Sequence, residues 1–234
     1  MWSEPIYIPE KKMHLFFLDT EGTESTNREK NHDAKIFALA ILMSSLFMFN
    51  SIGSIDEKSI SQLSLTTKLS ENIALSGNKK NSEHDEAQLA KFTPKFIWIL
   101  RDFTLELQDS YQKNINPTQY LENALRDQST ISKSNEQNRK IRSALLNFFK
   151  NRDCVTMVRP VIEENDLQRL NSLPNHRLRK EFLLQLKGLK EKVLYETTPK
   201  QLNGVNLNAR MFCGMMKNFL DSINKGGVPN ITSA

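Results

Sequence analysis

The chain has 234 residues, of which 38% are hydrophobic and 25% are charged, and its net charge is +5. This length can bury a hydrophobic core, and the composition is typical of a globular domain rather than of a disordered or disulfide-rich chain. The basic residues are scattered, so nucleic-acid binding is not predicted, and the histidines lack the spacing of a zinc site.

The first strong pattern is an apolar run at residues 14–18, which ends in Asp19, Thr20, Glu21 and Gly22. We expect a buried strand that delivers Asp19 to the carboxyl end of a sheet, where open α/β sheets bind ligands. A carboxylate there suits a hydrated Mg²⁺, and a glycine lets its N–H approach a phosphate oxygen. The same residue types also form ordinary turns, so that interpretation stays open.

Residues 1–8 predict a preceding strand, and a polar loop is expected at residues 23–32. Asp33 can cap a helix that starts at the next residue. Residues 36–52 are nearly all apolar but are too short and too interrupted by serines for a membrane span. They predict a buried helix, a turn and a buried strand.

The remaining chain alternates strand-like and helical patterns around a polar loop at residues 77–91. Strands are predicted at 95–100 and 154–158, and helices at 60–73, 119–126, 138–149, 163–170, 176–195 and 209–223. The basic residues of the 176–195 segment fit a solvated helix face better than a nucleic-acid or membrane surface. This alternation indicates an α/β fold with a mostly parallel sheet.

Cys154 and Cys213 both lie among apolar residues and are predicted to be buried free thiols. Free thiols are typical of a reducing compartment, which predicts a cytoplasmic protein.

Arg101 and Asp102 directly follow the predicted strand at 95–100. A carboxylate can accept two parallel hydrogen bonds from the ring N–H and the exocyclic amine of guanine, whereas adenine offers no such pair of donors. The planar guanidinium of Arg101 can stack on or beside the base. The alternative is a surface ion pair at a strand end.

These segments resemble the guanylate-binding proteins, which are dynamin-like large GTPases with an atlastin-related G domain. The resemblance is carried, in order, by residues 17–22, 33–53, 98–103, 117–125, 158–160, 203–208 and 223–234. It implies a P-loop-NTPase-type G domain over residues 1–225 that lacks the first strand, the P-loop and the first switch. Residues 226–234 would begin the linker to a helical domain that this sequence does not contain.

The resemblance also implies roles for the motif at residues 19–23. Asp19 would hold Mg²⁺ through water, and Thr20 to Thr23 would form the second switch. Within this switch the amide of Gly22 would sense the γ-phosphate of GTP. Glu21 would help to position the attacking water, so Glu21 and Gly22 are the expected catalytic residues.

Arg101 and Asp102 would replace the Asn-Lys-x-Asp guanine signature of small GTPases. Arg159 opens a segment, approximately residues 159–175, that resembles the guanine cap, which covers the base and shapes a dimer interface. The implied partners are GTP or GDP with Mg²⁺ and a second G domain, from the same or a related chain. A full-length form could also associate peripherally with membranes.

One departure from this family bears directly on function. The sequence has only eight glycines and contains no Gly-x-x-x-x-Gly-Lys-Ser/Thr motif. Without this phosphate cradle, we expect weak binding of the β- and γ-phosphates and little hydrolysis by this chain alone. Two hypotheses follow: a GTPase represented by an N-terminally truncated chain, or a non-catalytic module that dimerises with full-length GTPases.

Overall fold

The structure is a computed structural model that describes residues 2–20, 30–63, 93–109, 111–126, 136–202 and 204–225. The described strands are β1 (Trp2–Ile8), β2 (Met13–Phe17), β3 (Leu46–Ile52), β4 (Lys95–Arg101), β5 (Arg152–Met157), β6 (Gln201–Leu202) and β7 (Val205–Asn206). The described α-helices are α1 (Lys30–Met43), α2 (Glu57–Gln62), α5 (Pro117–Arg126), α6 (Glu136–Phe148), α7 (Glu164–Gln168), α8 (Lys180–Glu196) and α9 (Ala209–Asn224).

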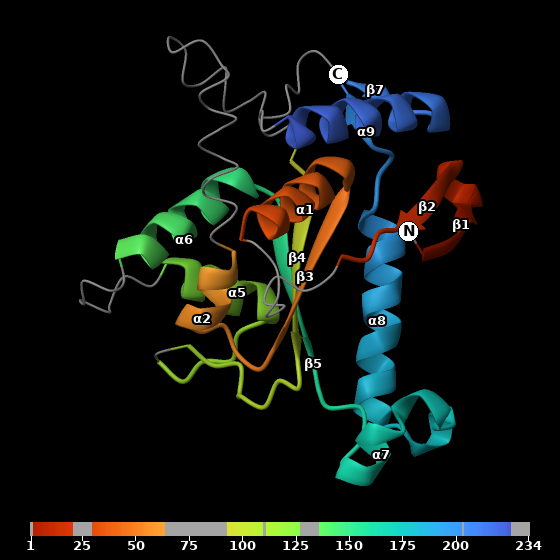
Figure 1. The fold of residues 1–234 in the computed structure, drawn as a ribbon. Helices are drawn as coiled ribbons and strands as arrows, with labels where there is room; N and C mark the ends of the chain where they lie inside the picture. The colour runs from red at the N-terminus through yellow and green to blue at the C-terminus, as the bar shows by residue number, and fades with distance from the viewer. Residues whose placement is uncertain are drawn as a thin grey trace.

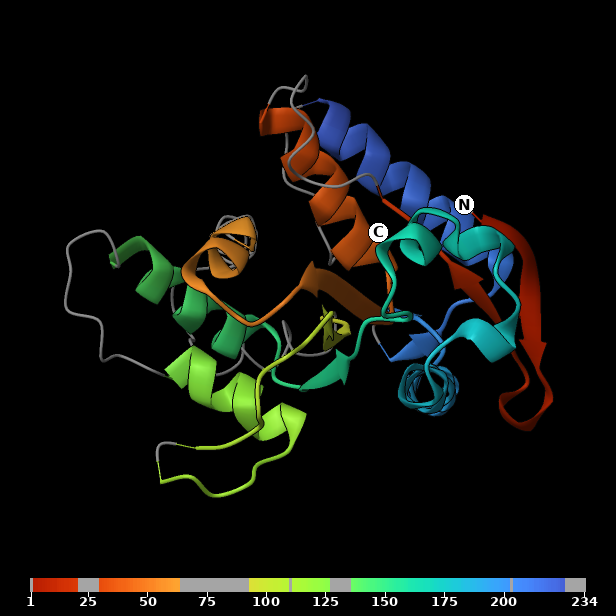
Figure 2. The same ribbon diagram turned by 90° about the horizontal axis from the view of Figure 1, so that it is seen from below.

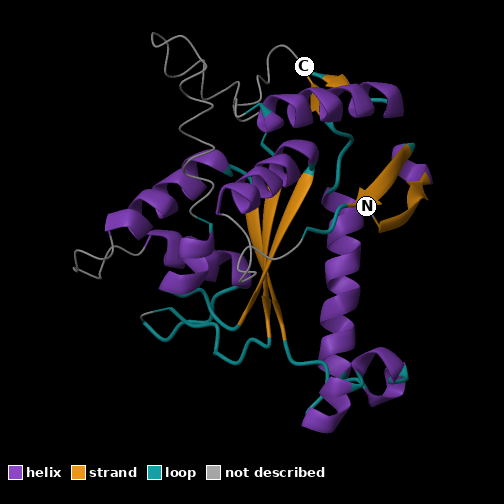
Figure 3. Cartoon of the chain, viewed as in Figure 1, coloured by secondary structure: helices purple, strands orange, loops and turns teal. Residues whose placement is uncertain are grey.

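The centre of the molecule is a parallel sheet, drawn in orange in Figure 3, whose strands pair in the order β3-β4-β5. Its middle strand, β4, is buried from Phe96 to Leu100. Helices cover both faces of this sheet, which explains why β4 is continuously apolar from Phe96 to Leu100 instead of alternating. This arrangement confirms the predicted α/β fold with a parallel sheet flanked by helices.

The two faces of the sheet have different helical layers (Figures 1 and 2). Phe96, Trp98 and Leu100 of β4 belong to a core cluster with residues of α1, α2, α5 and α6. Ile97 and Ile99 belong to a second cluster, in which α8 covers the opposite face. Because successive strand residues point to opposite faces, one apolar strand supplies both cores.

The segment from α1 to β3 follows the predicted pattern of helix, turn and strand. A turn after Met43 is closed by the Ser44 N–H, which donates to the Ala40 carbonyl oxygen (N···O 3.1 Å). The helix begins at Lys30, so Asp33 lies inside it and the predicted cap is wrong. Within the described ranges, no helix combines the length and apolar character needed to cross a bilayer.

Several predicted segments fall on residues that the structure does not describe. They include most of the loop at 23–32, the end of the helix predicted over 60–73, the polar segment at 77–91, and residues 226–234.

The predicted strand at residues 14–18 exists as β2, but its predicted burial is wrong. It pairs antiparallel with β1 in a two-stranded sheet that is separate from β3-β4-β5. Phe16 and Phe17 are 45% and 37% exposed, whereas Met13 and Leu15 pack against Val193 of α8. The continuous apolar run suggested a strand covered on both faces, yet only one face of the hairpin is covered.

The C-terminal half contains two further differences from the predictions. The helix expected from residue 176 begins at Lys180, after a separate 3-10 turn at Asn175–Arg177.

Cys154 is buried, and burial raises the pKa of its thiol to about 12. Cys213, on α9, is exposed, so the prediction of two buried thiols is wrong for this residue. Its helix packs on α1 through Met215 and Phe219 instead.

Lys200 joins the β6 segment to the end of α1. Its Nζ donates to the Ser44 carbonyl oxygen (2.8 Å), and its own carbonyl oxygen accepts from the Leu207 N–H (N···O 2.8 Å). Burial lowers the pKa of Lys200 to about 8. The charged form is therefore less favourable in the folded protein than in the unfolded chain.

We expect the free energy of unfolding to rise with pH between the folded pKa of Lys200, about 8, and its unfolded pKa of about 10.4. In this range the unfolded state binds more protons, so Lys200 contributes a slope of at most about 1.4 kcal/mol per pH unit. Urea unfolding of the wild type and of Lys200→Met across this range measures the contribution. The raised pKa of Cys154 gives an opposing slope, but both proteins share it. Equal pH dependence in the two proteins would contradict the prediction.

Candidate functional site

The carboxyl ends of β3, β4 and β5 meet at one edge of the sheet. The ladder pairs Ile52 with Arg101 and Arg101 with Met157, so the next residues of the three strands leave the sheet side by side. In Figure 1 this edge is the lower end of the sheet, close to the chain that follows β4 and to α7. Ligands of open α/β sheets bind at such an edge.

Arg101 and Asp102 lie at the middle of this edge, as the sequence predicted. The Arg101 carbonyl oxygen accepts from the Gly53 N–H (N···O 2.7 Å), and the Phe103 N–H donates to the Met157 carbonyl oxygen (3.0 Å). Between these two bonds Asp102 takes a left-handed conformation with φ of 53°, which aspartate tolerates better than most residues. Within the described part of the chain, no hydrogen bond or ion pair engages its half-buried carboxylate.

Arg159 is exposed and follows β5 at the same edge, so the structure brings this predicted residue close in the fold to the Arg101 strand end. The chain around it is tied to α8. The Val158 N–H donates to Oε1 of Gln185 (2.7 Å), and the Arg179 N–H donates to the Pro160 carbonyl oxygen (2.8 Å). These bonds fix both ends of the segment between β5 and α8.

The predicted cap segment at 159–175 contains α7, which lies within the helix expected at 163–170, and a 3-10 turn at Leu170–Ser172. Asp166 is 7% exposed and forms ion pairs with Arg177 (2.8 Å) and Arg169 (3.5 Å). The hydrogen bond from Arg177 lowers the pKa of the Asp166 carboxyl. This pair closes the segment into a compact lobe next to the sheet edge.

The second predicted group of site residues is described only in part. Asp19 and Thr20 are exposed and follow β2, whereas Glu21, Gly22 and Thr23 lie outside the described residues. Because β2 pairs with β1 and not with β3, Asp19 does not sit at the carboxyl end of a strand in the parallel sheet. The expected delivery of Asp19 by a strand of that sheet is therefore wrong in this structure.

Comparison with known proteins identifies the family. Residues 1–202 match the family described as "Guanylate-binding protein, N-terminal domain". The whole chain aligns with guanylate-binding protein 4 of Homo sapiens at 31% identity over 237 residues, and with guanylate-binding protein 2 of Mus musculus at 32% over 238 residues. The chain belongs to the guanylate-binding protein family.

These alignments cover 100% of this chain but only 37% of the human and 40% of the mouse guanylate-binding protein. Guanylate-binding protein 1 of Homo sapiens also aligns with the whole chain, at 31% identity, and 40% of its own length is covered. The family resemblance inferred from the residues alone is confirmed.

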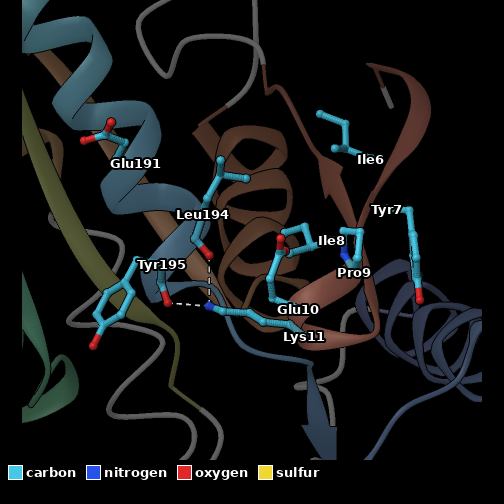
Figure 4. A pocket seen from close by; sticks show the side chains of 9 residues that line it. All are labelled: Ile6, Tyr7, Ile8, Pro9, Glu10, Lys11, Glu191, Leu194 and Tyr195. Atoms are coloured by element: carbon cyan, nitrogen blue, oxygen red, sulfur yellow. Dashed lines mark hydrogen bonds between the residues drawn. The ribbon is translucent and has the colours of Figure 1, made fainter.

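A concave surface of this guanylate-binding protein family member lies between the β1–β2 hairpin and α8 (Figure 4). It has a volume of about 420 Å³ and a lining that includes Ile6, Tyr7, Leu194 and Tyr195. Lys11 crosses it, and its Nζ donates to the carbonyl oxygens of Leu194 (2.9 Å), Tyr195 and Thr197 (2.8 Å). A cation at this position satisfies the unpaired carbonyls at the end of α8 and interacts favourably with its dipole. Lys11 thus has a structural role.

Sequence reasoning missed the contacts that hold the site residues. Gly53 has a positive φ of 77°, which gives a reason for glycine at that position. The Asp166–Arg177 pair joins residues 11 positions apart, and the contact of Gln185 with Val158 spans 27 positions; neither pair carried a sequence pattern. In the ranges that the structure describes, no group of three or more His, Cys, Asp or Glu side chains could hold a metal ion.

Proposed function

We propose that this chain recognises guanine nucleotides through Arg101 and Asp102 and belongs to a GTP-binding and GTP-hydrolysing large GTPase. The observation that carries the proposal is the position of Asp102 at the strand edge. Main-chain hydrogen bonds of the residues before and after it fix its backbone, and among the described residues its carboxylate has no hydrogen-bond or ion-pair partner. Such a carboxylate can accept the two neighbouring donors of guanine, and Arg101 can stack against the base. Membership of the guanylate-binding protein family supports this assignment.

The phosphate end of the nucleotide would be served by the motif at residues 19–23. The exposed carboxylate of Asp19 is an oxygen donor of the type that suits Mg²⁺ held through water. When bound, Mg²⁺ would neutralise charge on the β- and γ-phosphates. We propose that Thr20, Glu21, Gly22 and Thr23 contact the γ-phosphate and the attacking water.

Titration of the 234-residue chain with GTP, GMP and AMP tests the proposal. We expect GMP to bind more tightly than AMP, because Asp102 recognises the base and not the phosphates. We also expect GTP to bind within about tenfold of GMP and to turn over no faster than in buffer, since the sequence contains no P-loop motif. Equal binding of GMP and AMP would overturn the assignment to guanine. Micromolar GTP affinity with turnover would overturn the expected weakness of phosphate binding.

A second candidate function is a non-catalytic module that pairs with full-length GTPases, and the compact lobe beside the sheet edge favours it. The surface that we propose for this contact is the lobe at residues 159–177, which the Asp166–Arg177 pair holds together. Analytical ultracentrifugation of the chain mixed with a full-length relative tests it. We expect a mixed dimer that weakens when Arg159 is replaced by glutamate, and sedimentation as separate species would contradict this role.

A further inference from the structure

The turn that carries Asp102 depends on a residue of the neighbouring strand connection. Gly53 directly follows β3 and donates its N–H to the Arg101 carbonyl oxygen, with an N···O distance of 2.7 Å. On the other side, the Phe103 N–H donates to the Met157 carbonyl oxygen of β5. The orientation of the Asp102 side chain therefore follows from contacts made by the residues before and after it.

Residue 53 must be glycine because of its backbone conformation, and not because a side chain would clash with a neighbour. Its φ is +77°, and a Cβ added to it would meet no atom within 4 Å. A residue with a side chain is strained at this φ, whereas glycine is not. Any relaxation of that strain would move the N–H that holds the Arg101 carbonyl.

A second connection supports the same turn from the core. The Ile55 N–H, two residues after Gly53, donates to the Tyr120 hydroxyl oxygen (3.3 Å). The Tyr120 ring lies edge-on to Phe103, with 5.6 Å between ring centroids and an interplanar angle of 74°. Phe103 is only 8% exposed. The connection after β3 and the turn after β4 are thus linked at two points, once through the main chain and once through Tyr120.

We propose that Gly53 is a positioning residue for guanine recognition, because its N–H fixes the turn that presents Asp102 to the base. This inference rests on the proposed function. Two parallel hydrogen bonds to one carboxylate demand closer alignment than one, since hydrogen bonds weaken steeply as they lose linearity. A displaced Asp102 would first lose the contact to the exocyclic amine, which guanine has and hypoxanthine lacks. The affinity ratio of GMP to IMP therefore reports the position of Asp102.

The chain offers a matched control for replacing Gly53. Gly204, between β6 and β7, has φ of +79° and also has no atom within 4 Å of an added Cβ. The strand β7 that follows it lies at the opposite end of the molecule from the carboxyl edge of the sheet (Figure 1). Gly53→Ala and Gly204→Ala therefore introduce similar backbone strain, but only the first one acts on the Arg101 carbonyl.

The experiment measures GMP and IMP binding by NMR titration, and thermal unfolding, for the wild type and both variants. We expect similar losses of thermal stability in the two variants and a GMP-to-IMP ratio that falls about fivefold or more in Gly53→Ala only. An unchanged ratio in a folded Gly53→Ala variant would overturn the inference while leaving the proposed function intact. No preference for GMP over IMP in the wild type would instead overturn the assignment of Asp102, and the inference with it.

A second pair of variants covers the case in which Gly53→Ala does not fold. Tyr120→Phe removes the oxygen that accepts from the Ile55 N–H, and Tyr111→Phe makes the same change at a residue that is 88% exposed. We expect the GMP-to-IMP ratio to fall in Tyr120→Phe and to stay at the wild-type value in Tyr111→Phe. Equal ratios in these two variants would contradict a positioning role for the linked connection.

Discussion

Replacing Trp98 with alanine is expected to reduce the free energy of unfolding by about 3–5 kcal/mol, the usual loss for a fully buried aromatic residue. Trp98 is 0% exposed at the centre of the sheet. Its ring lies edge-on to Phe49 and Phe96, with centroid distances of 5.3 and 6.1 Å. Because a domain is stable by only about 5–15 kcal/mol in total, this variant should be largely unfolded in mild denaturant.

The measurement is urea unfolding followed by far-ultraviolet circular dichroism, which does not depend on the removed indole. Trp98→Phe retains a ring and should lose less stability than Trp98→Ala. Ser51→Ala is a separate probe, because the Trp98 Nε1–H donates to the Ser51 Oγ (2.9 Å) and would lose its partner. We expect Ser51→Ala to cost about 1–3 kcal/mol. A loss below about 1 kcal/mol in Trp98→Ala would contradict the central role of this residue in the core.

Replacing Asp102 with asparagine is expected to weaken GMP binding at least about tenfold and to shift the preference toward XMP. The asparagine amide presents a donor where guanine also presents one, whereas xanthine has a carbonyl oxygen at that position. The fold should be retained, since asparagine tolerates the positive φ of 53° at this position. The effect should therefore appear in nucleotide preference and not in stability.

NMR titrations with GMP and XMP measure this preference, and Asp221→Asn is the matched control. Asp221 is an exposed residue of α9, so the control makes the same change in charge away from the strand edge. Asp221→Asn should bind both nucleotides like the wild type. If Asp102→Asn keeps the wild-type preference for GMP over XMP, then Asp102 does not recognise the base.

The parallel core could be predicted from the sequence because its signals are local. The run from Phe96 to Leu100 is apolar over a length typical of a strand, and β3 follows α1 after a short serine turn. The resemblance to guanylate-binding proteins also depends on short motifs in a fixed order. Arg101 and Asp102 were located correctly because a residue that ends a strand of a parallel sheet must lie at its carboxyl edge.

The partner of each strand could not be deduced in this way. The run at residues 14–18 has the composition of a buried strand, but its position depends on β1, which it pairs with, and on α8, which covers one face. In the same way, the apolar sequence around Cys213 reflects the contact of α9 with α1, which buries Met215 and Phe219 and leaves the thiol outside. Burial depends on which face of an element meets a neighbour, and such contacts join residues that are distant in the sequence.

The sequence by itself determined the family, the α/β order of the elements and the residues that end β4, because each depends on residues close together along the chain. Only the tertiary structure decided that Gly53, Phe103 and Met157 hold the turn at Asp102, and that Asp166 and Arg177 close the neighbouring lobe. These contacts form between segments that the sheet and the helices bring together. Their geometry therefore becomes defined only when the parallel core has formed.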